Sequence, residues 1–178
     1  WFGKERRANR AICDALYGEI VAAARQPVLY AQWQVPDTPL GRFEMVALHM
    51  LLVQRRLRGE AGAAAAEIGQ VLTDEFFADL DHSLRELGIG DMGMPKRMKR
   101  LARMFYGRTR AYGDALDAGD RATLAAALAR NVRPDVESWP ESDLLAEYAD
   151  TAARRLAEQP IAAICAGQIA FPTAGDGR

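Results

Sequence analysis

From Thr38 to Val53 the chain reads TPLGRFEMVALHMLLV, and this stretch decides the fold. Thr38 suits the N-cap of a helix, and Pro39 suits its first position because the amide that proline lacks would be unpaired there. Apolar residues recur on one side of the expected helix, and the opposite side is also apolar, at Met45, Leu48 and Leu52. Because a helix that is apolar all round is normally buried, we expect a central helix surrounded by others.

The rest of the composition also favours helices. Ala and Leu dominate, β-branched residues are sparse, and no segment alternates apolar and polar residues for long enough to make a convincing strand. A length of 178 residues with 49% hydrophobic content is ordinary for one soluble globular domain. We therefore predict an all-α fold, in which residues 1–178 form a single-domain bundle of about six helices around the central apolar helix.

Apolar spacing and helix breakers place the other helices. Pro27 ends the first helix and leaves an extended connector over residues 28–39. Gly88 and Gly90 end the third helix and permit the turn to the fourth. The last helix is expected to start behind a capping box formed by Ser138 and Glu141. Besides the central helix, the expected helices are 4–26, 63–87, 94 through 112, 120–130 and 140–158, followed by an irregular tail at 160–178.

The helix expected from residue 94 carries only basic charges, and an acidic and aromatic segment at 74–81 precedes it. Over the whole chain 23 Lys and Arg nearly balance 24 Asp and Glu, so the net charge of -1 hides this local positive field. Such a face is commonly just solvated or paired with neighbouring acids. The functional alternative is docking on lipid headgroups, ribosomal RNA or a client protein. The candidate partner-binding residues are Lys96, Lys99, Arg100, Arg103, Tyr106, Arg108 and Arg110, with Phe77 as a further exposed apolar candidate.

The remaining candidate residues are better explained by structural roles than by catalysis or metal binding. Asp79 falls within the apolar arc of the third helix, so we expect a structural ion pair with a cation such as Arg42 or one of the basic helix. His49 lies on an apolar helix face and is expected to be a core histidine that donates to a backbone carbonyl. Asp79 and His82 match only half of a helical di-iron ligand set, so we predict no metal.

Catalysis and membrane insertion are not indicated. Neither cysteine has zinc-ligand spacing or a base nearby in sequence, and no glycine fingerprint for phosphate follows a strand. We predict no catalytic residue. The longest strongly apolar stretch, 161–171, is about half of the ~20 residues that a membrane-spanning helix needs. Because the sequence begins at Trp1 and not at Met, we expect further residues to precede it, with any targeting or anchoring segment among them.

Four motifs together resemble the ubiquinol-cytochrome c chaperone family over residues 17–112. They are Pro36-Asp37-Thr38-x-x-Gly41-Arg42-Phe43-Glu44, Phe76-Phe77-x-Asp79-x-Asp81, Leu84-Arg85-Glu86-x-Gly88-x-Gly90-Asp91, and Phe105-Tyr106-Gly107-Arg108 with Tyr112. The resemblance implies an all-helical, non-enzymatic assembly factor for ubiquinol-cytochrome c reductase, without a cofactor. In mitochondria this family binds newly made cytochrome b near the ribosomal exit tunnel, together with a small partner protein. The Ala- and Arg-rich composition suggests a bacterial relative, from the alphaproteobacterial side of the family.

The resemblance also implies partners and a location. The partners would be cytochrome b or another membrane-protein client, the ribosome, an anionic membrane surface, and a homodimer mate or small partner protein, with no DNA among them. The location would be cytoplasmic and peripheral to the inner membrane, or the matrix side in a mitochondrion. Carried onto this chain, Asp37, Arg42 and Glu44, with Thr38, would fix the connector by capping and pairing. The alternatives to a chaperone are a helical lipid- or quinone-binding protein and an enzyme with an unrecognised site in the bundle.

Overall fold

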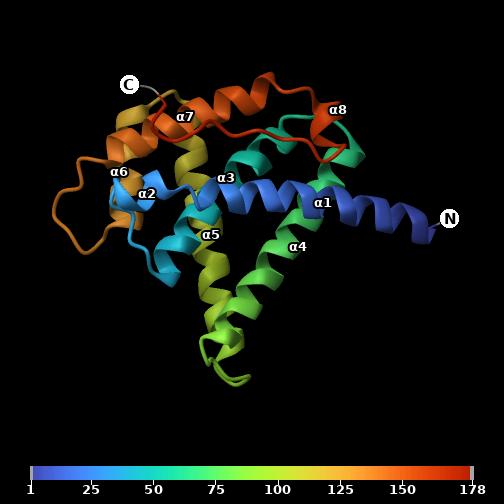
Figure 1. The fold of residues 1–178 in the computed structure, drawn as a ribbon, viewed down its shortest axis with the longest axis horizontal. Helices are drawn as coiled ribbons and strands as arrows, with labels where there is room; N and C mark the ends of the chain where they lie inside the picture. The colour runs from blue at the N-terminus through green and yellow to red at the C-terminus, as the bar shows by residue number, and fades with distance from the viewer. Residues whose placement is uncertain (1, 177–178) are drawn as a thin grey trace.

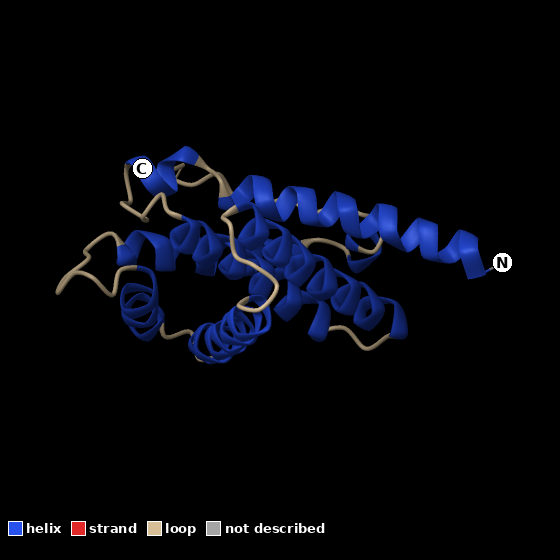
Figure 2. Cartoon of the chain, turned by 90° about the horizontal axis from the view of Figure 1, so that it is seen from below, coloured by secondary structure: helices blue, strands red, loops and turns tan. Residues whose placement is uncertain are grey.

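The computed structural model describes residues 2–176, and all regular secondary structure in that range is helical (Figure 2). The predicted all-α class is therefore confirmed. The helices are α1 (Phe2–Ala24), α2 (Pro27–Ala31), α3 (Pro39–Arg58), α4 (Ala63–Glu86), α5 (Met94–Asp117), α6 (Arg121–Val132), α7 (Ser142–Glu158) and α8 (Ile161–Ile164).

Helix α3 is the central element, as its sequence predicts. The Thr38 side chain caps it by accepting a hydrogen bond from the Gly41 amide at 3.1 Å. Met45, Leu48 and Leu52 on one side are almost completely buried, and so are Phe43, Met50 and Leu51 on the other. Helices α1, α4, α5 and α7 all pack against α3, so its apolar faces fill the core of the bundle.

Helices α4 and α5 form a hairpin that projects from the rest of the bundle. In Figure 1 the two helices run downward and meet in a turn at the lower end of the molecule, far from both termini. Gly88 ends α4 with φ of 87°, a left-handed conformation that glycine adopts without strain. The turn at residues 87–93 therefore reverses the chain through a position that a larger side chain would strain.

A buried polar network links α3, α7, the end of α1 and the C-terminal segment. His49 is fully buried, with Nδ1 2.7 Å from the Met45 carbonyl and Nε2 2.8 Å from the Tyr148 hydroxyl. Since only the protonated nitrogen can donate to a carbonyl, Nδ1 carries the proton and Nε2 accepts from Tyr148. Gln26 donates to the Tyr148 oxygen at 3.0 Å and accepts from the Ala174 amide at 2.8 Å. The prediction of a core histidine that donates to a backbone carbonyl is confirmed.

This network makes stability depend on pH. Burial lowers the pKa of His49 from 6.5 to about 4, so the unfolded chain binds a proton over a pH range in which the folded chain does not. The contribution is fully present above pH 6.5 and is lost as pH falls toward 4, by about 2 kcal/mol between roughly pH 6.5 and 5. We expect His49→Gln to remove this loss, which denaturant titrations at several pH values will measure.

The comparison with the wild type is needed because a second group acts in the opposite direction. Burial and the nearby Asp14 raise the pKa of Glu75 to about 7, so protonation of Glu75 favours the folded chain as pH falls. This term is common to the wild type and His49→Gln, and it cancels in their difference. His82→Gln, at an exposed position of α4, is the matched control and should change stability by less than about 0.5 kcal/mol at neutral pH. A constant difference between wild type and His49→Gln from about pH 7 to 5 would contradict the assignment.

Three predicted boundaries are wrong. The connector 28–39 is not wholly extended, because Pro27 starts the short α2, which buries Leu29. The predicted capping box is absent: α7 begins at Ser142, and the Glu141 carboxylate instead accepts from Gln34 at 2.9 Å. The segment after Pro160, predicted to be irregular throughout, contains α8 before it runs along the bundle without further helix to residue 176.

Candidate functional site

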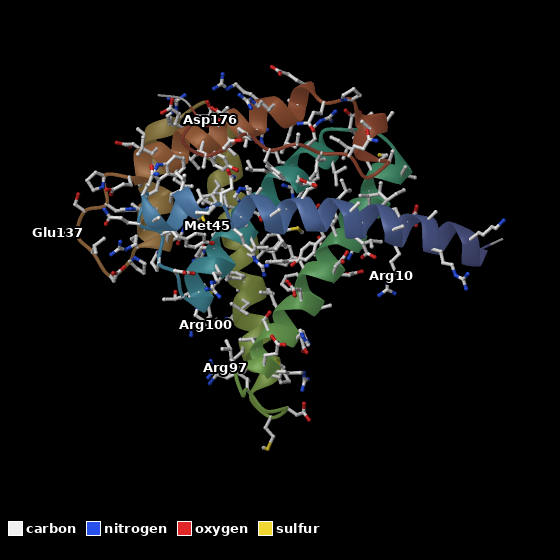
Figure 3. The ribbon with its side chains drawn as sticks, viewed as in Figure 1. Arg10, Met45, Arg97, Arg100, Glu137 and Asp176 are labelled. Carbon is white, nitrogen blue, oxygen red and sulfur yellow. The ribbon has the colours of Figure 1, made fainter. Side chains whose placement is uncertain are left out.

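An apolar groove lies where the start of α3 meets the α4–α5 hairpin. It has a volume of about 330 Å³, and its apolar lining includes Leu40, Leu84, Leu87, Ile89, Leu101 and Met104. Leu40 is 51% exposed and Leu87 is 58% exposed, so two large apolar side chains expose surface at the same groove. Arg97 and Arg100 contribute to the lining from α5. Figure 3 shows both arginines on the lower half of the hairpin, below the start of α3. We call this feature the hairpin groove.

A basic face runs along α5 and meets the groove at Arg100. Its exposed cations are Lys96, Lys99, Arg100, Arg103 and Arg110, and within residues 2–176 none of them forms an ion pair. Tyr106 lies on the same face and is 57% exposed. No acidic residue occurs between Met94 and Gly113, so no charge on α5 itself offsets this field before its last turn. The sequence-based expectation of a cationic face is met at these positions.

Arg108 is the exception, because an internal ion pair holds the guanidinium that was predicted to contact a partner. Its guanidinium donates to the Glu44 carboxylate at 2.5 and 2.6 Å, and the Arg108 and Glu44 side chains are only 12% and 2% exposed. The predicted structural pairing of Glu44 is thus correct, with Arg108 as its partner. Burial raises the pKa of Glu44, and the hydrogen bonds to Arg108 oppose that shift. At about 100° per residue Arg108 lies about 120° from Lys96, toward the apolar side, which is the signal that could have separated it from the basic face.

Asp79 and Arg42 do not pair with each other. Asp79 is exposed and accepts a hydrogen bond from the Tyr17 hydroxyl at 2.7 Å, and no ion pair involves it among the described residues. The predicted ion pair is wrong because Asp79 stays in water and needs no compensating charge. Arg42 instead donates to Asp37 at 2.8 Å, in a pair whose side chains are both 62% exposed. The predicted pairing of Asp37 and Arg42 near the start of α3 is present in the structure.

Phe77 is not a free apolar contact. It is half-buried, with its ring 5.3 Å from Phe76 and 5.9 Å from Phe105. Tyr106 lies at the surface end of this aromatic cluster, 6.3 Å from Phe77. The prediction of Phe77 as exposed partner-binding surface is therefore wrong. Sequence analysis missed Leu40 and Leu87. Their place in one groove was not readable, because Leu40 lies at the start of α3 and Leu87 directly follows α4.

Other site types find little support within residues 2–176. No group of three or more His, Cys, Asp or Glu residues is placed to hold a metal. Burial raises the pKa of the Cys13 thiol to about 11, the opposite of the shift that activates a nucleophilic cysteine. None of the described helices combines the length and the apolar character required to cross a membrane.

Comparisons with known proteins agree with the motifs. The model of the ubiquinol-cytochrome C chaperone family matches residues 31–171. The chain belongs to this family. The match extends beyond the motif-bearing part of the chain, through α6 and α7. The crystal structure of the Cbp3 homolog from Brucella abortus is 54% identical, covers 98% of this chain and 96% of that chain, and gives a TM-score of 0.91. No curated protein matches the chain significantly.

Membership of the ubiquinol-cytochrome C chaperone family confirms the predicted family, and the likeness to a Brucella protein is consistent with the predicted bacterial origin. The protein is thus an assembly chaperone for ubiquinol-cytochrome c reductase. Family and structural relative both point to an assembly factor and not to an enzyme.

Proposed function

We propose that this chaperone holds an apolar segment of newly made cytochrome b, or of a related membrane-protein client, in the hairpin groove. The basic face of α5 then docks the complex on an anionic surface, either the ribosome or the membrane. The single observation that carries this proposal is the exposed, mostly apolar groove beside a run of unpaired cations. Membership of the family supports a client from the reductase complex.

The chemistry of the groove suits an apolar helix. Leu40 and Leu87 expose apolar surface to water, and covering it with a client side chain is favourable by about 25 cal/mol for each Å² removed from water. Arg97 and Arg100 lie beside this apolar surface, where they can donate to the unpaired carbonyls at the C-terminus of a client helix. A membrane-destined helix offers both an apolar surface and such carbonyls.

The basic face supports a peripheral position at the membrane that houses the reductase. Ribosomal RNA and anionic lipids both present phosphates to Lys and Arg. A second copy of the chain or a small partner protein is the other candidate occupant of the hairpin groove. Recovery of cytochrome b with the tagged chaperone, together with the molecular mass from light scattering, distinguishes a client from a second copy or a small partner protein.

We expect Leu40→Glu and Leu87→Glu each to reduce recovery of cytochrome b with the tagged chaperone by roughly tenfold, because a buried charge is costly in an apolar interface. Val136→Glu is the matched control, since Val136 is also an exposed apolar residue, 36% accessible, but lies on the loop between α6 and α7. It should leave recovery unchanged. Thermal unfolding of each variant will confirm that the fold is retained.

If both groove variants recover as much cytochrome b as the wild type does, the groove is not the client-binding site. A groove variant that dissociates a dimer, as measured by light scattering, would show instead that a second copy occupies the groove. Loss of a small co-purifying protein with retained cytochrome b would assign the groove to that partner.

A further inference from the structure

We propose that the tip of the α4–α5 hairpin inserts into the surface of an anionic lipid bilayer. Met92 would enter the apolar phase, and the first cations of α5 would contact the lipid headgroups. This inference rests on the proposed docking role of α5 and names the docking partner as lipid. It places the hairpin groove at the membrane surface, where an apolar client must be delivered.

The shape of the tip permits insertion. The turn between α4 and α5 forms the lower end of the molecule in Figure 1, and no other helix covers it in that view. Met92 is 100% exposed, so its whole side chain is available to enter an apolar phase. Gly88, Gly90 and Gly93 add no side chain to the turn, and Leu87 adds a second exposed apolar residue. The tip is therefore narrow and has apolar side chains in contact with water.

The only acid of the turn does not oppose docking. Asp91 pairs with Arg85, which also binds Asp81 at 2.7 Å. This pairing lowers the pKa of Asp91, so the carboxylate stays charged and is held beside the arginine. Glu86, near the end of α4, lies 3.2 Å from His82. One arginine on α4 is thus shared by two acids near the tip, whereas the cations at the start of α5 form no ion pair among residues 2–176.

The charge near the tip favours an anionic surface. Residues 81–103 contain six Lys or Arg and three Asp or Glu, so this segment is positive although the chain as a whole is not. Lys96, Arg97, Lys99 and Arg100 all lie in the first two turns of α5, directly behind the apolar tip. Each cation close to an anionic membrane strengthens binding by roughly fivefold. An apolar tip next to a group of cations lets a protein insert at the level of the lipid headgroups.

Lipid fits the tip better than RNA does. Single-stranded RNA is held by cations together with aromatic side chains that stack on bases. The exposed aromatic residue of α5 is Tyr106, which lies about 18 Å along the helix from Met94 at 1.5 Å per residue. Met92 and Leu87 offer apolar surface that phosphates and sugars would leave in water. Single-stranded RNA bound along α5 would thus use Tyr106 and not the tip.

The test is co-sedimentation of the purified chain with vesicles of phosphatidylcholine, with or without phosphatidylglycerol. The wild type should bind the anionic vesicles and not the neutral ones, and salt should weaken binding. Met92→Asp should weaken binding roughly tenfold, and Lys96→Glu with Lys99→Glu at least about thirtyfold. Val136→Asp, on a loop remote in sequence from the hairpin, is the matched control and should bind as the wild type does. All four positions are exposed, so the variants should fold.

The outcomes separate this inference from the proposed client binding. Met92→Asp should still capture cytochrome b from detergent extracts, because Met92 is not part of the groove lining. Loss of vesicle binding with retained capture would support tip insertion. Equal binding of neutral and anionic vesicles, no binding by the wild type, or unchanged binding by Met92→Asp would overturn it. Binding of ribosomes without vesicle binding would overturn it in favour of RNA, whatever the groove variants show.

Discussion

Replacing Arg108 with alanine should lower the free energy of unfolding by about 3–5 kcal/mol, because it leaves the Glu44 carboxylate buried without its counter-ion. Glu44 is 2% exposed and receives hydrogen bonds from two guanidinium nitrogens of Arg108. A carboxylate buried without a cationic partner is costly. Chemical denaturation of the wild type and Arg108→Ala will measure the loss.

A double variant tests the cause of that loss. Glu44→Leu with Arg108→Leu removes both charges and keeps apolar volume, so we expect it to regain most of the lost stability. Arg103→Ala, an exposed cation five residues earlier on α5, should change stability by less than about 0.5 kcal/mol. A double variant as unstable as Arg108→Ala would show that packing, and not the unpaired charge, dominates.

Gly41→Ala is the second substitution with a large expected effect, a loss of at least about 3 kcal/mol in the free energy of unfolding. A Cβ atom at Gly41 would lie 1.8 Å from the Pro36 carbonyl oxygen and 2.8 Å from its carbon. Both are backbone atoms, so the connector before α3 would have to move. The start of α3 and Leu40 would move with it, so the hairpin groove should also be altered.

Gly41→Ala should change stability in the opposite direction from alanine at an ordinary helix position. Alanine normally stabilises a helix by about 1 kcal/mol relative to glycine. Gly18→Ala in α1 is the matched control, since Gly18 is exposed and has no other group within 4 Å of its added Cβ. It should raise the melting temperature, while Gly41→Ala should lower it. Two substitutions with the same sign would mean that the connector relaxes freely around Gly41.

Local signals were sufficient for the longer helices, but not for the short α2 and α8. The Thr38 cap and the breaker Pro27 act on residues a few positions away, so their effects are readable without knowing the neighbours in space. The prediction of a capping box at Ser138 and Glu141 was wrong, because it considered only residues that are close in sequence. In the structure, Gln34, which lies 107 residues away from Glu141, donates a hydrogen bond to the Glu141 carboxylate.

The candidate site divides in a similar way. The positive charge of α5 was evident because every charge from Lys96 to Arg110 has the same sign. Which of those cations is free was not evident, since Glu44 lies 64 residues before Arg108. The hairpin groove needs Leu40 of α3 and Leu87, just after α4, in one lining, and no spacing within one helix encodes that arrangement.

By itself the sequence determined the helical class, the central position of α3, the family and the sign of the charge on α5. Periodicity, capping and motif order are properties of neighbouring residues along the chain, and they persist wherever the helices pack. Only the tertiary structure decided that Arg108 is neutralised, that Asp79 stays in water, and that Leu40 and Leu87 share a groove. Burial and pairing depend on which helix lies opposite a side chain, and that is settled when distant segments pack together.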